Sequence, residues 1–135
     1  MHKSKYYNKT KLDFLGKGPI YRSLFDNGSV YLFHHASGFA GAKVSLNILA
    51  GSMFETTSQH GVAHILEHLI FKEIKTNLIQ EMELIGAEVN AYTYKESMCF
   101  EMSCLASKLD LLLTKFLDIF LELEFSDEQF EKEKK

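Results

Sequence analysis

The chain has 135 residues, of which 46% are hydrophobic and 24% charged, a composition that suits one compact globular domain and excludes a disordered chain. The formal net charge is −3, so no basic field favours nucleic acid as a partner. No apolar run reaches the roughly 20 residues that a membrane span needs, so we expect no membrane insertion.

The first 18 residues are polar and partly basic, and no apolar run follows them. This pattern is not typical of a secretory signal, so we expect a cytoplasmic protein with a poorly ordered lead-in over residues 1–18. Cys99 and Cys104 are five residues apart, which is neither a zinc-ribbon nor a redox spacing. We expect both thiols to be reduced and buried.

The first regular elements after Pro19 are predicted to be strands. Residues 20–25 and 29–36 flank an Asp-Asn-Gly turn at 26–28, which is a strong hairpin signal. Residues 42–52 alternate apolar and polar side chains, as a half-buried strand does. Residues 53–59 are expected to form a loop.

Further along, the spacing of apolar residues changes to the i, i+3, i+4 pattern of a helix and back. The order of the elements predicts an α+β fold with a mainly antiparallel sheet covered by helices on one face. The last helix is short and charged, so it would be marginal alone, and we expect the domain to be incomplete at its C-terminus. The expected elements are a helix over 60–72, a helix over 75–85 ended by Gly86, strands over 87–94 and 97–106, a helix over 108–123 capped by Ser107, and a helix that Ser126 and Gln129 begin as a capping box.

The segment HILEH places three ionisable groups in apolar surroundings. His64 and His68 are four residues apart, so on a helix both imidazoles project from nearly the same face. Neutral imidazole is a preferred zinc ligand. Glu67 borders that face and could take a proton from a water that the metal activates.

An alternative is a hydrogen-bonded pair of core histidines with Glu67 as an ion-pair partner. Burying three titratable groups without a metal costs several kcal/mol unless they are paired. H-x-x-E-H is also the inverted form of the H-E-x-x-H zinc helix. We therefore favour a zinc site with His64 and His68 as ligands, and we expect His60, one turn earlier, to face solvent or bond a backbone group.

Four segments together resemble one family. Residues 51–55 read G-S-M-F-E, residues 61–71 read GVAHILEHLIF, residues 86–93 read GAEVNAYT, and residues 130–134 read FEKEK. In this order they resemble the pitrilysin or insulinase family of zinc metallopeptidases, whose members read G-S-x-x-E, then G-x-A-H-x-x-E-H-x-x-F, then G-x-x-x-N-A-x-T.

The resemblance implies a zinc-dependent endopeptidase. By this likeness His64 and His68 are the metal ligands, and Glu67 is the general base that activates a zinc-bound water for hydrolysis of peptide bonds. Asn90 and Ala91 match a strand that holds the peptide substrate, which in physical terms is β-augmentation. The alternative for Asn90 is a strand-end residue that bonds its own turn.

Two departures from the family pattern matter. The family follows its motif with F-x-G-T, whereas Phe71 is followed here by Lys-Glu-Ile, so we expect an altered loop. The family's third zinc ligand is a glutamate about seven residues beyond the position of Glu133, near 140, and catalytic zinc sites normally have three protein ligands. We therefore expect residues 19–135 to be the N-terminal portion of a peptidase domain truncated before that ligand.

The resemblance also implies a partner, either a second homologous domain or a second copy in a homodimer. The isolated chain is expected to be inactive. Two other functions stay open: a non-catalytic, peptidase-like scaffold or assembly protein, and a plain α+β binding module whose histidines are core residues.

Overall fold

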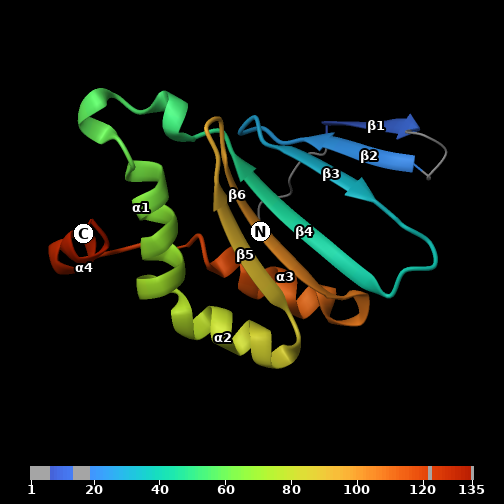
Figure 1. Cartoon of the computed structure of the whole chain (residues 1–135). Helices are drawn as coiled ribbons and strands as arrows, with labels where there is room; N and C mark the ends of the chain where they lie inside the picture. Colours follow the sequence, from blue (N-terminus) through green and yellow to red (C-terminus); the bar gives the residue numbers. More distant parts are fainter. Residues whose placement is uncertain (1–6, 14–18, 122, 135) are drawn as a thin grey trace. The chain divides into compact units, whose positions relative to one another are not determined.

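The computed structural model describes residues 7–13, 19–121 and 123–134, which fall into two compact units divided between Phe39 and Ala40 (Figure 1). In the first unit β1 (Tyr7–Asp13), β2 (Pro19–Leu24) and β3 (Val30–His34) pair antiparallel in the order β1-β2-β3. Within the expected lead-in, residues 7–13 form a strand, and the remainder of residues 1–18 lies outside the described residues.

The hairpin of the first unit is confirmed. The amide of Phe25 donates to the carbonyl of Ser29 at 2.9 Å, and Gly28 has a φ of +83°. A positive φ is what a tight hairpin turn requires and what glycine adopts without strain.

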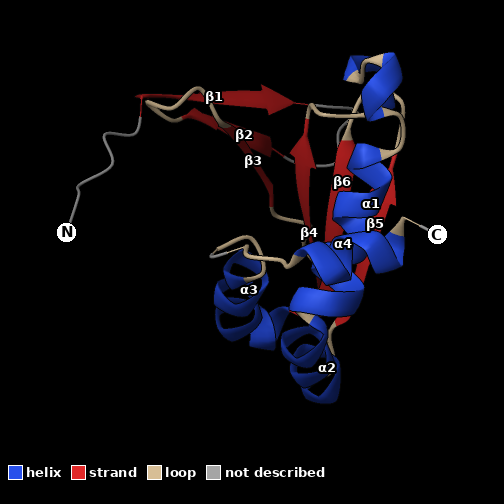
Figure 2. Ribbon diagram, turned by 90° about the vertical axis from the view of Figure 1, so that its left-hand side faces the viewer, coloured by secondary structure: helices blue, strands red, loops and turns tan. Residues whose placement is uncertain are grey.

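The second unit contains the other sheet and, among the described residues, all the helices. Strands β4 (Gly41–Ile48), β5 (Glu88–Thr93) and β6 (Met98–Leu105) pair antiparallel in the order β4-β6-β5. Helices α1 (Val62–His68), α2 (Thr76–Ile85), α3 (Leu109–Asp118) and α4 (Asp127–Glu133) complete it (Figure 2). The predicted α+β class is confirmed.

One face of this sheet forms the hydrophobic core. Phe100 and Met102 of β6 are fully buried against Met82 of α2 and Phe116 of α3. Burying each such side chain contributes about 1.5–3 kcal/mol. The ring of Phe120 packs edge-on against Phe100, with centroids 4.8 Å apart.

The opposite face of the sheet is polar. The ammonium of Lys43 lies 2.9 Å from Glu101, and the hydroxyl of Ser45 donates to the other oxygen of Glu101 at 3.1 Å. Successive residues of a strand point to opposite faces, so this polar row and the core row come from the same two strands. Cys99 and Cys104 are both buried and free, as expected.

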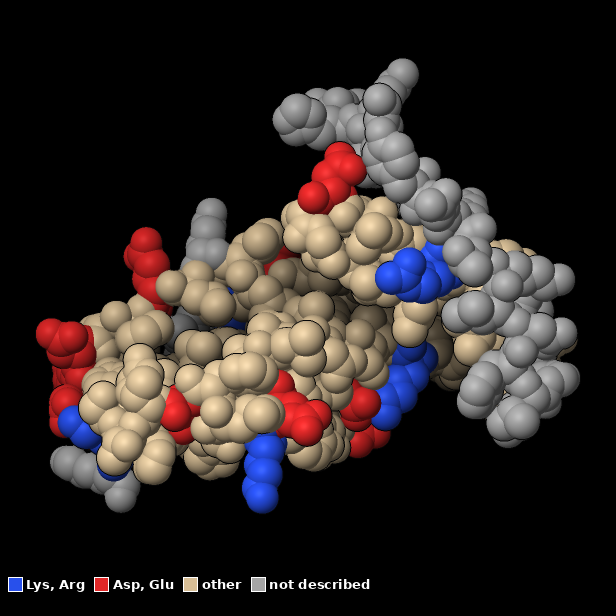
Figure 3. All heavy atoms as spheres, turned by 90° about the horizontal axis from the view of Figure 1, so that it is seen from above, with Lys and Arg blue, Asp and Glu red and all other residues tan. Residues whose placement is uncertain are grey.

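Charges of both signs are interspersed with neutral side chains on the face of the molecule that Figure 3 presents. Within the described ranges, no helix has both the length and the apolar character to cross a bilayer.

The helix expected over 60–72 is divided. α1 ends at His68, and residues Leu69–Ile74 continue as a π-helical turn. The amide of Lys75 donates to the carbonyl of Ile70, five residues back, and the hydroxyl of Thr76 donates to the carbonyl of Lys72 at 2.6 Å. This turn stands where an altered loop was expected, and π-turns of this kind often lie at functional sites.

Two other boundaries predicted from the sequence were wrong. Ser107 lies inside a short 3-10 turn, Ala106–Lys108, and does not cap α3. α3 ends at Asp118 and not at 123, because the amides of Ile119 and Phe120 bond carbonyls only three residues back. This tighter turn buries Ile119 completely in the core. The loop expected over 53–59 also contains two 3-10 turns, Ser52–Phe54 and Thr57–Gln59.

The capping box of α4 is confirmed. The amide of Gln129 donates to the hydroxyl of Ser126, and the amide of Ser126 donates to the side-chain oxygen of Gln129 at 2.8 Å. The helix would be marginal alone, but it packs against α1 and the π-helical turn.

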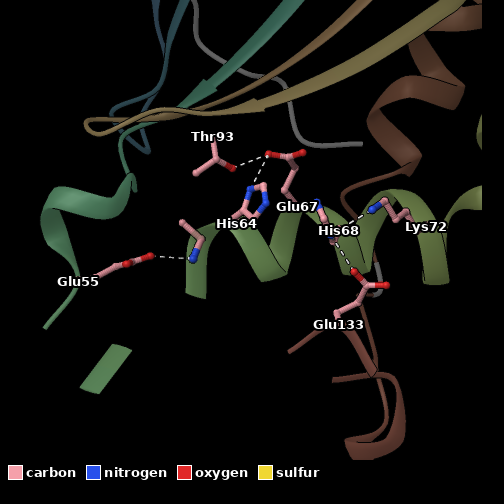
Figure 4. A network of polar contacts seen from close by, with 8 residues as sticks. Glu55, His64, Glu67, His68, Lys72, Thr93 and Glu133 are labelled. Atoms are coloured by element: carbon pink, nitrogen blue, oxygen red, sulfur yellow. Dashed lines mark hydrogen bonds and ion pairs between the residues drawn. The ribbon is translucent and has the colours of Figure 1, made fainter. Parts of the chain in front are cut away.

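A single carboxylate holds the start of α1. Glu55 accepts hydrogen bonds from the amides of Gly61 at 2.8 Å and Ala63 at 2.9 Å. Figure 4 shows the side chain of Glu55 reaching a backbone amide at the start of the helix. These amides belong to the first turn of the helix, where no intrahelical acceptor exists and negative charge is favoured. The bonds from Ala63 and then Gly61 lower the pKa of the Glu55 carboxyl below its ordinary value.

The position of Glu55 depends on Gly51. A β-carbon on Gly51 would collide with the backbone carbonyls of Tyr94 and Lys95 in the turn between β5 and β6. The amide of Met53 donates to the carbonyl of Lys95 at 2.8 Å. Only glycine lets the backbone at position 51 lie so close to the β5–β6 turn. This contact holds the 3-10 turn before Glu55 against the end of the sheet.

We predict that Glu55→Gln destabilises the protein at neutral pH. The folded-state pKa of Glu55 is lowered, so its contribution is fully present above the unfolded pKa of about 4.3 and is lost as the pH falls through the folded pKa. Urea unfolding followed by circular dichroism should therefore show a difference from wild type at pH 7 that shrinks below pH 4.

Glu83→Gln is the matched control, because Glu83 is exposed on α2 and its side chain makes no hydrogen bond or ion pair with another described residue. Equal unfolding midpoints for wild type and Glu55→Gln at pH 7 would contradict the capping role.

Candidate metal centre

The structure brings His64, Glu67 and His68 together on one face of α1 (Figure 4). The two imidazole rings have centroids 4.4 Å apart and planes inclined by 52°. One ligand atom from each of the three residues lies within 4.8 Å of the others. The helical spacing alone predicted this convergence.

The rotation of α1 about its axis sets which of its residues face solvent. Ala63 is buried in the core, and Leu66 packs against it. The opposite side of the helix is open: the side chain of His64 is 61% exposed and that of His68 is 27% exposed. An ion can therefore reach the imidazoles from solvent.

Glu67 is held from the sheet. The hydroxyl of Thr93, at the end of β5, donates to Oε2 of Glu67 at 2.5 Å. The same oxygen lies 3.9 Å from Nδ1 of His64. The side chain of Glu67 is 15% exposed, so the carboxylate lies at the boundary between the sheet and the open face of α1.

His68 is held from the opposite direction by α4. Its Nδ1 lies 2.8 Å from Oε2 of Glu133, whose side chain is only 12% exposed. Both polar partners of the ring, Glu133 and Lys72, contact Nδ1, so Nε2 is the nitrogen left for a metal. Lys72 brings a positive charge to within 3.2 Å of the same Nδ1.

The donor set suits zinc. Imidazole nitrogens and a carboxylate are its usual ligands, and a tetrahedral site with bonds of about 2.0–2.1 Å places ligand atoms roughly 3.4 Å apart. Ligand atoms of the two imidazoles and of the carboxylate lie within 4.8 Å of one another, so the imidazoles could hold an ion with the carboxylate beside it. A hydrogen-bonded core pair fits less well, because His64 is largely exposed.

The other residues singled out from the sequence lie elsewhere. His60 is exposed in the turn before α1 and is not part of this group. Ala91 is half-buried on the core face of β5. Asn90 points to the polar face of the sheet, where its amide donates to Glu88 at 3.0 Å. Side chains of neighbouring strand residues diverge, so Asn90 and Ala91 do not share a surface.

An apolar cavity of about 220 Å³ opens on the other side of α1 from the histidines. None of the three candidate metal residues lines it. Its walls are Ala50, Gly51, Phe54, Glu55, Gln59, Val62, Ala63, Leu66 and Met98.

Sequence reasoning missed the roles of Glu55, Thr93 and Glu133. Each lies inside a segment that carries the resemblance, but the spacing along the chain does not show what its side chain contacts. The bonds to α1 come from a preceding turn, a strand and a later helix. Only the folded chain brings these four elements together.

Comparison with known proteins supports the resemblance. A sequence profile described as Insulinase (Peptidase family M16) matches residues 32–135. The mitochondrial-processing peptidase subunit beta of Caenorhabditis elegans is 35% identical over 102 residues, which cover 73% of this chain and 22% of that protein. The mouse protein named cytochrome b-c1 complex subunit 1, mitochondrial, is 34% identical over 116 residues, covering 83% of this chain and 24% of that protein.

A protein of Bacillus subtilis named as an uncharacterized zinc protease is 29% identical over 119 residues, covering 85% of this chain and 29% of that protein. The crystal structure of a protease from Helicobacter pylori shares the fold, with a TM-score of 0.65 at 19% identity, over 93% of this chain and 29% of that one. The chain thus spans less than a third of the length of these relatives. Because the family profile matches most of its residues, the chain belongs to the insulinase family of peptidases, peptidase family M16.

Proposed function

We propose that this chain carries the zinc-binding helix and the general base of a metalloendopeptidase. The observation that supports this most directly is the convergence of His64, Glu67 and His68 on the solvent-facing side of α1. Their donor types match zinc, and His68 has a carboxylate partner that leaves Nε2 available.

In this function zinc supplies a Lewis acid and lowers the pKa of a water molecule at the site. Glu67 would act as the base toward that water, since its carboxylate borders the histidines and accepts a hydrogen bond from Thr93. Glu133 keeps the ring of His68 in one orientation.

The peptide substrate is proposed to bind along β5. This strand is at the end of the order β4-β6-β5, so one of its edges is unpaired within that sheet, and it contacts α1. An extended peptide can add to such an edge through backbone hydrogen bonds. Asn90 and Ala91 would contribute through their main-chain groups, because their side chains point to opposite faces.

The described residues of the metal group provide two imidazoles and one carboxylate. A catalytic zinc site normally has three protein ligands besides water. If Glu67 acts as base, the chain supplies two ligands, and we expect its zinc affinity to be weaker than that of a complete site. Peptide hydrolysis by the whole protein is likewise proposed.

A second candidate is a non-catalytic subunit of a larger assembly. The mouse relative is named as a subunit of the cytochrome b-c1 complex and not as a peptidase. Such a protein could keep the fold without the hydrolysis.

We predict that the purified chain binds one zinc ion through α1. His64→Ala and His68→Ala should each weaken binding by about 100-fold, because two nitrogen ligands cannot be replaced by one. Competition with a chromophoric chelator measures the affinity. His60→Ala is the matched control, since His60 is four residues before His64 and exposed. The proposal fails if wild type binds no zinc, or if His60→Ala loses as much affinity as the other two variants.

We predict that Glu133→Ala weakens zinc binding by about 10–100-fold, the effect typical of losing a hydrogen bond to a ligating histidine. The same competition assay applies. Glu131→Ala serves as the control on α4, because Glu131 is exposed and pairs only loosely with Lys134 at 3.5 Å. Unchanged affinity in Glu133→Ala would show that His68 does not need this partner.

We predict that Glu67→Gln abolishes peptide hydrolysis by the complete gene product while zinc content is retained. The amide cannot accept the proton of water, but it leaves both histidines in place. Mass spectrometry of an unstructured peptide mixture detects the cleavage. Equal cleavage by Glu67→Gln would exclude Glu67 as base, and an inactive zinc-loaded wild type would favour the non-catalytic subunit.

A further inference from the structure

We propose that Asn27 is a modification site, at which the side-chain amide is lost spontaneously through attack by the backbone nitrogen of Gly28. Both residues lie in the exposed turn between β2 and β3, within the first unit of the chain. The reaction does not involve the candidate metal centre, so this inference holds or fails independently of the proposed function.

The reaction needs only the chain and water. The nitrogen of Gly28 gives its proton to solvent base and bonds to Cγ of Asn27. The bond between Cγ and Nδ2 then breaks, and ammonia leaves. Water opens the resulting succinimide ring at either of its two carbonyls. One opening yields aspartate, and the other yields isoaspartate, in which the main chain runs through the former side-chain carbonyl.

The glycine after Asn27 favours closure of this ring. The nitrogen can reach Cγ only when the backbone rotates, and a side chain on the following residue obstructs that rotation. Gly28 has a φ of +83°, and a β-carbon on it would meet nothing within 4 Å, so the surrounding space is open. The chain has no other Asn-Gly pair: its remaining asparagines, Asn8, Asn47, Asn77 and Asn90, are followed by Lys, Ile, Leu and Ala.

The side chain of Asn27 is turned back toward the main chain that follows it. Its Oδ1 accepts a hydrogen bond from the amide of Ser29 at 3.0 Å. This bond keeps the carboxamide beside Gly28, which lies between the two bonded residues. Attack on Cγ builds negative charge on Oδ1, and a backbone N–H aimed at that oxygen stabilises the charge, as an oxyanion hole does.

One hydrogen bond opposes the reaction. The amide of Gly28 donates to the carbonyl of Phe25 at 2.9 Å, so the attacking nitrogen is occupied while the turn is closed. Opening the turn requires little free energy, because all five residues of β3 are exposed and segments with few buried contacts open readily. We therefore expect the reaction to pass through the opened turn and to be slower than in a free peptide.

Both products change the turn. Each adds one negative charge beside Asp26, which takes the formal net charge from −3 to −4. Aspartate can still accept the bond from Ser29. Isoaspartate adds a methylene to the main chain of the three-residue loop between the bonded residues Phe25 and Ser29. The spacing that pairs Leu24 with Val30 is then lost in this product.

The test incubates the purified chain at mildly alkaline pH, which favours loss of the Gly28 amide proton, and follows it by peptide mass mapping. The peptide that contains Asn27 should gain about 1 Da, because an amide is exchanged for an acid, and should separate into aspartate and isoaspartate forms. Peptides that contain Asn47 or Asn77 should keep their masses. A synthetic peptide of residues 24–31 gives the rate without the folded turn, and unfolding the chain in urea should raise its rate to that value.

Asn27→Gln is the matched control. It keeps an exposed amide at the same position, but its carbonyl carbon is one bond farther from the Gly28 nitrogen, so the five-membered ring cannot form. The proposal is overturned if Asn27 keeps its mass in the folded chain while the synthetic peptide is fully converted. It is also overturned if Asn47 or Asn77 converts as fast as Asn27, or if Asn27→Gln gains mass at the wild-type rate.

Discussion

The rotation of α1 about its own axis is the constraint on which the candidate site depends. Burial of Ala63 and the packing of Leu66 against the core fix the rotational setting of the helix. Because residues three and four apart share a face, that setting brings His64, Glu67 and His68 to the open side as a group. A different setting would bury the histidines, with a large cost for desolvating them.

A helix of seven residues cannot hold such a setting by propensity alone. Three contacts with other elements support it, and each of them involves a carboxylate. Glu55 binds amides of its first turn, Glu67 bonds Thr93 on the sheet, and His68 at its last residue bonds Glu133 on α4. The same contacts that stabilise the helix also orient two of its three chemical groups, so fold stability and site geometry are coupled.

The supporting contacts around the group are more complete than the ligand set itself. His68 has an orienting carboxylate and Glu67 has an orienting hydroxyl, whereas the candidate metal group contains only two imidazoles among the residues that the structure describes. Both supporting contacts come from outside α1, so the orientations of Glu67 and His68 depend on how α1 packs against the sheet and α4.

The sequence by itself determined what depends on neighbours within about four residues: the Asp-Asn-Gly hairpin, the Ser126 capping box, the helix end at Gly86 and the shared face of the two histidines. Only the tertiary structure decided the early end of α3, the π-helical turn after α1 and the bonds from Thr93 and Glu133, which lie 26 and 65 residues from their partners. The physical reason is the separation along the chain over which each kind of interaction acts. Turn and cap chemistry is local, whereas pairing between distant elements follows from how the core packs, which no spacing along the chain encodes.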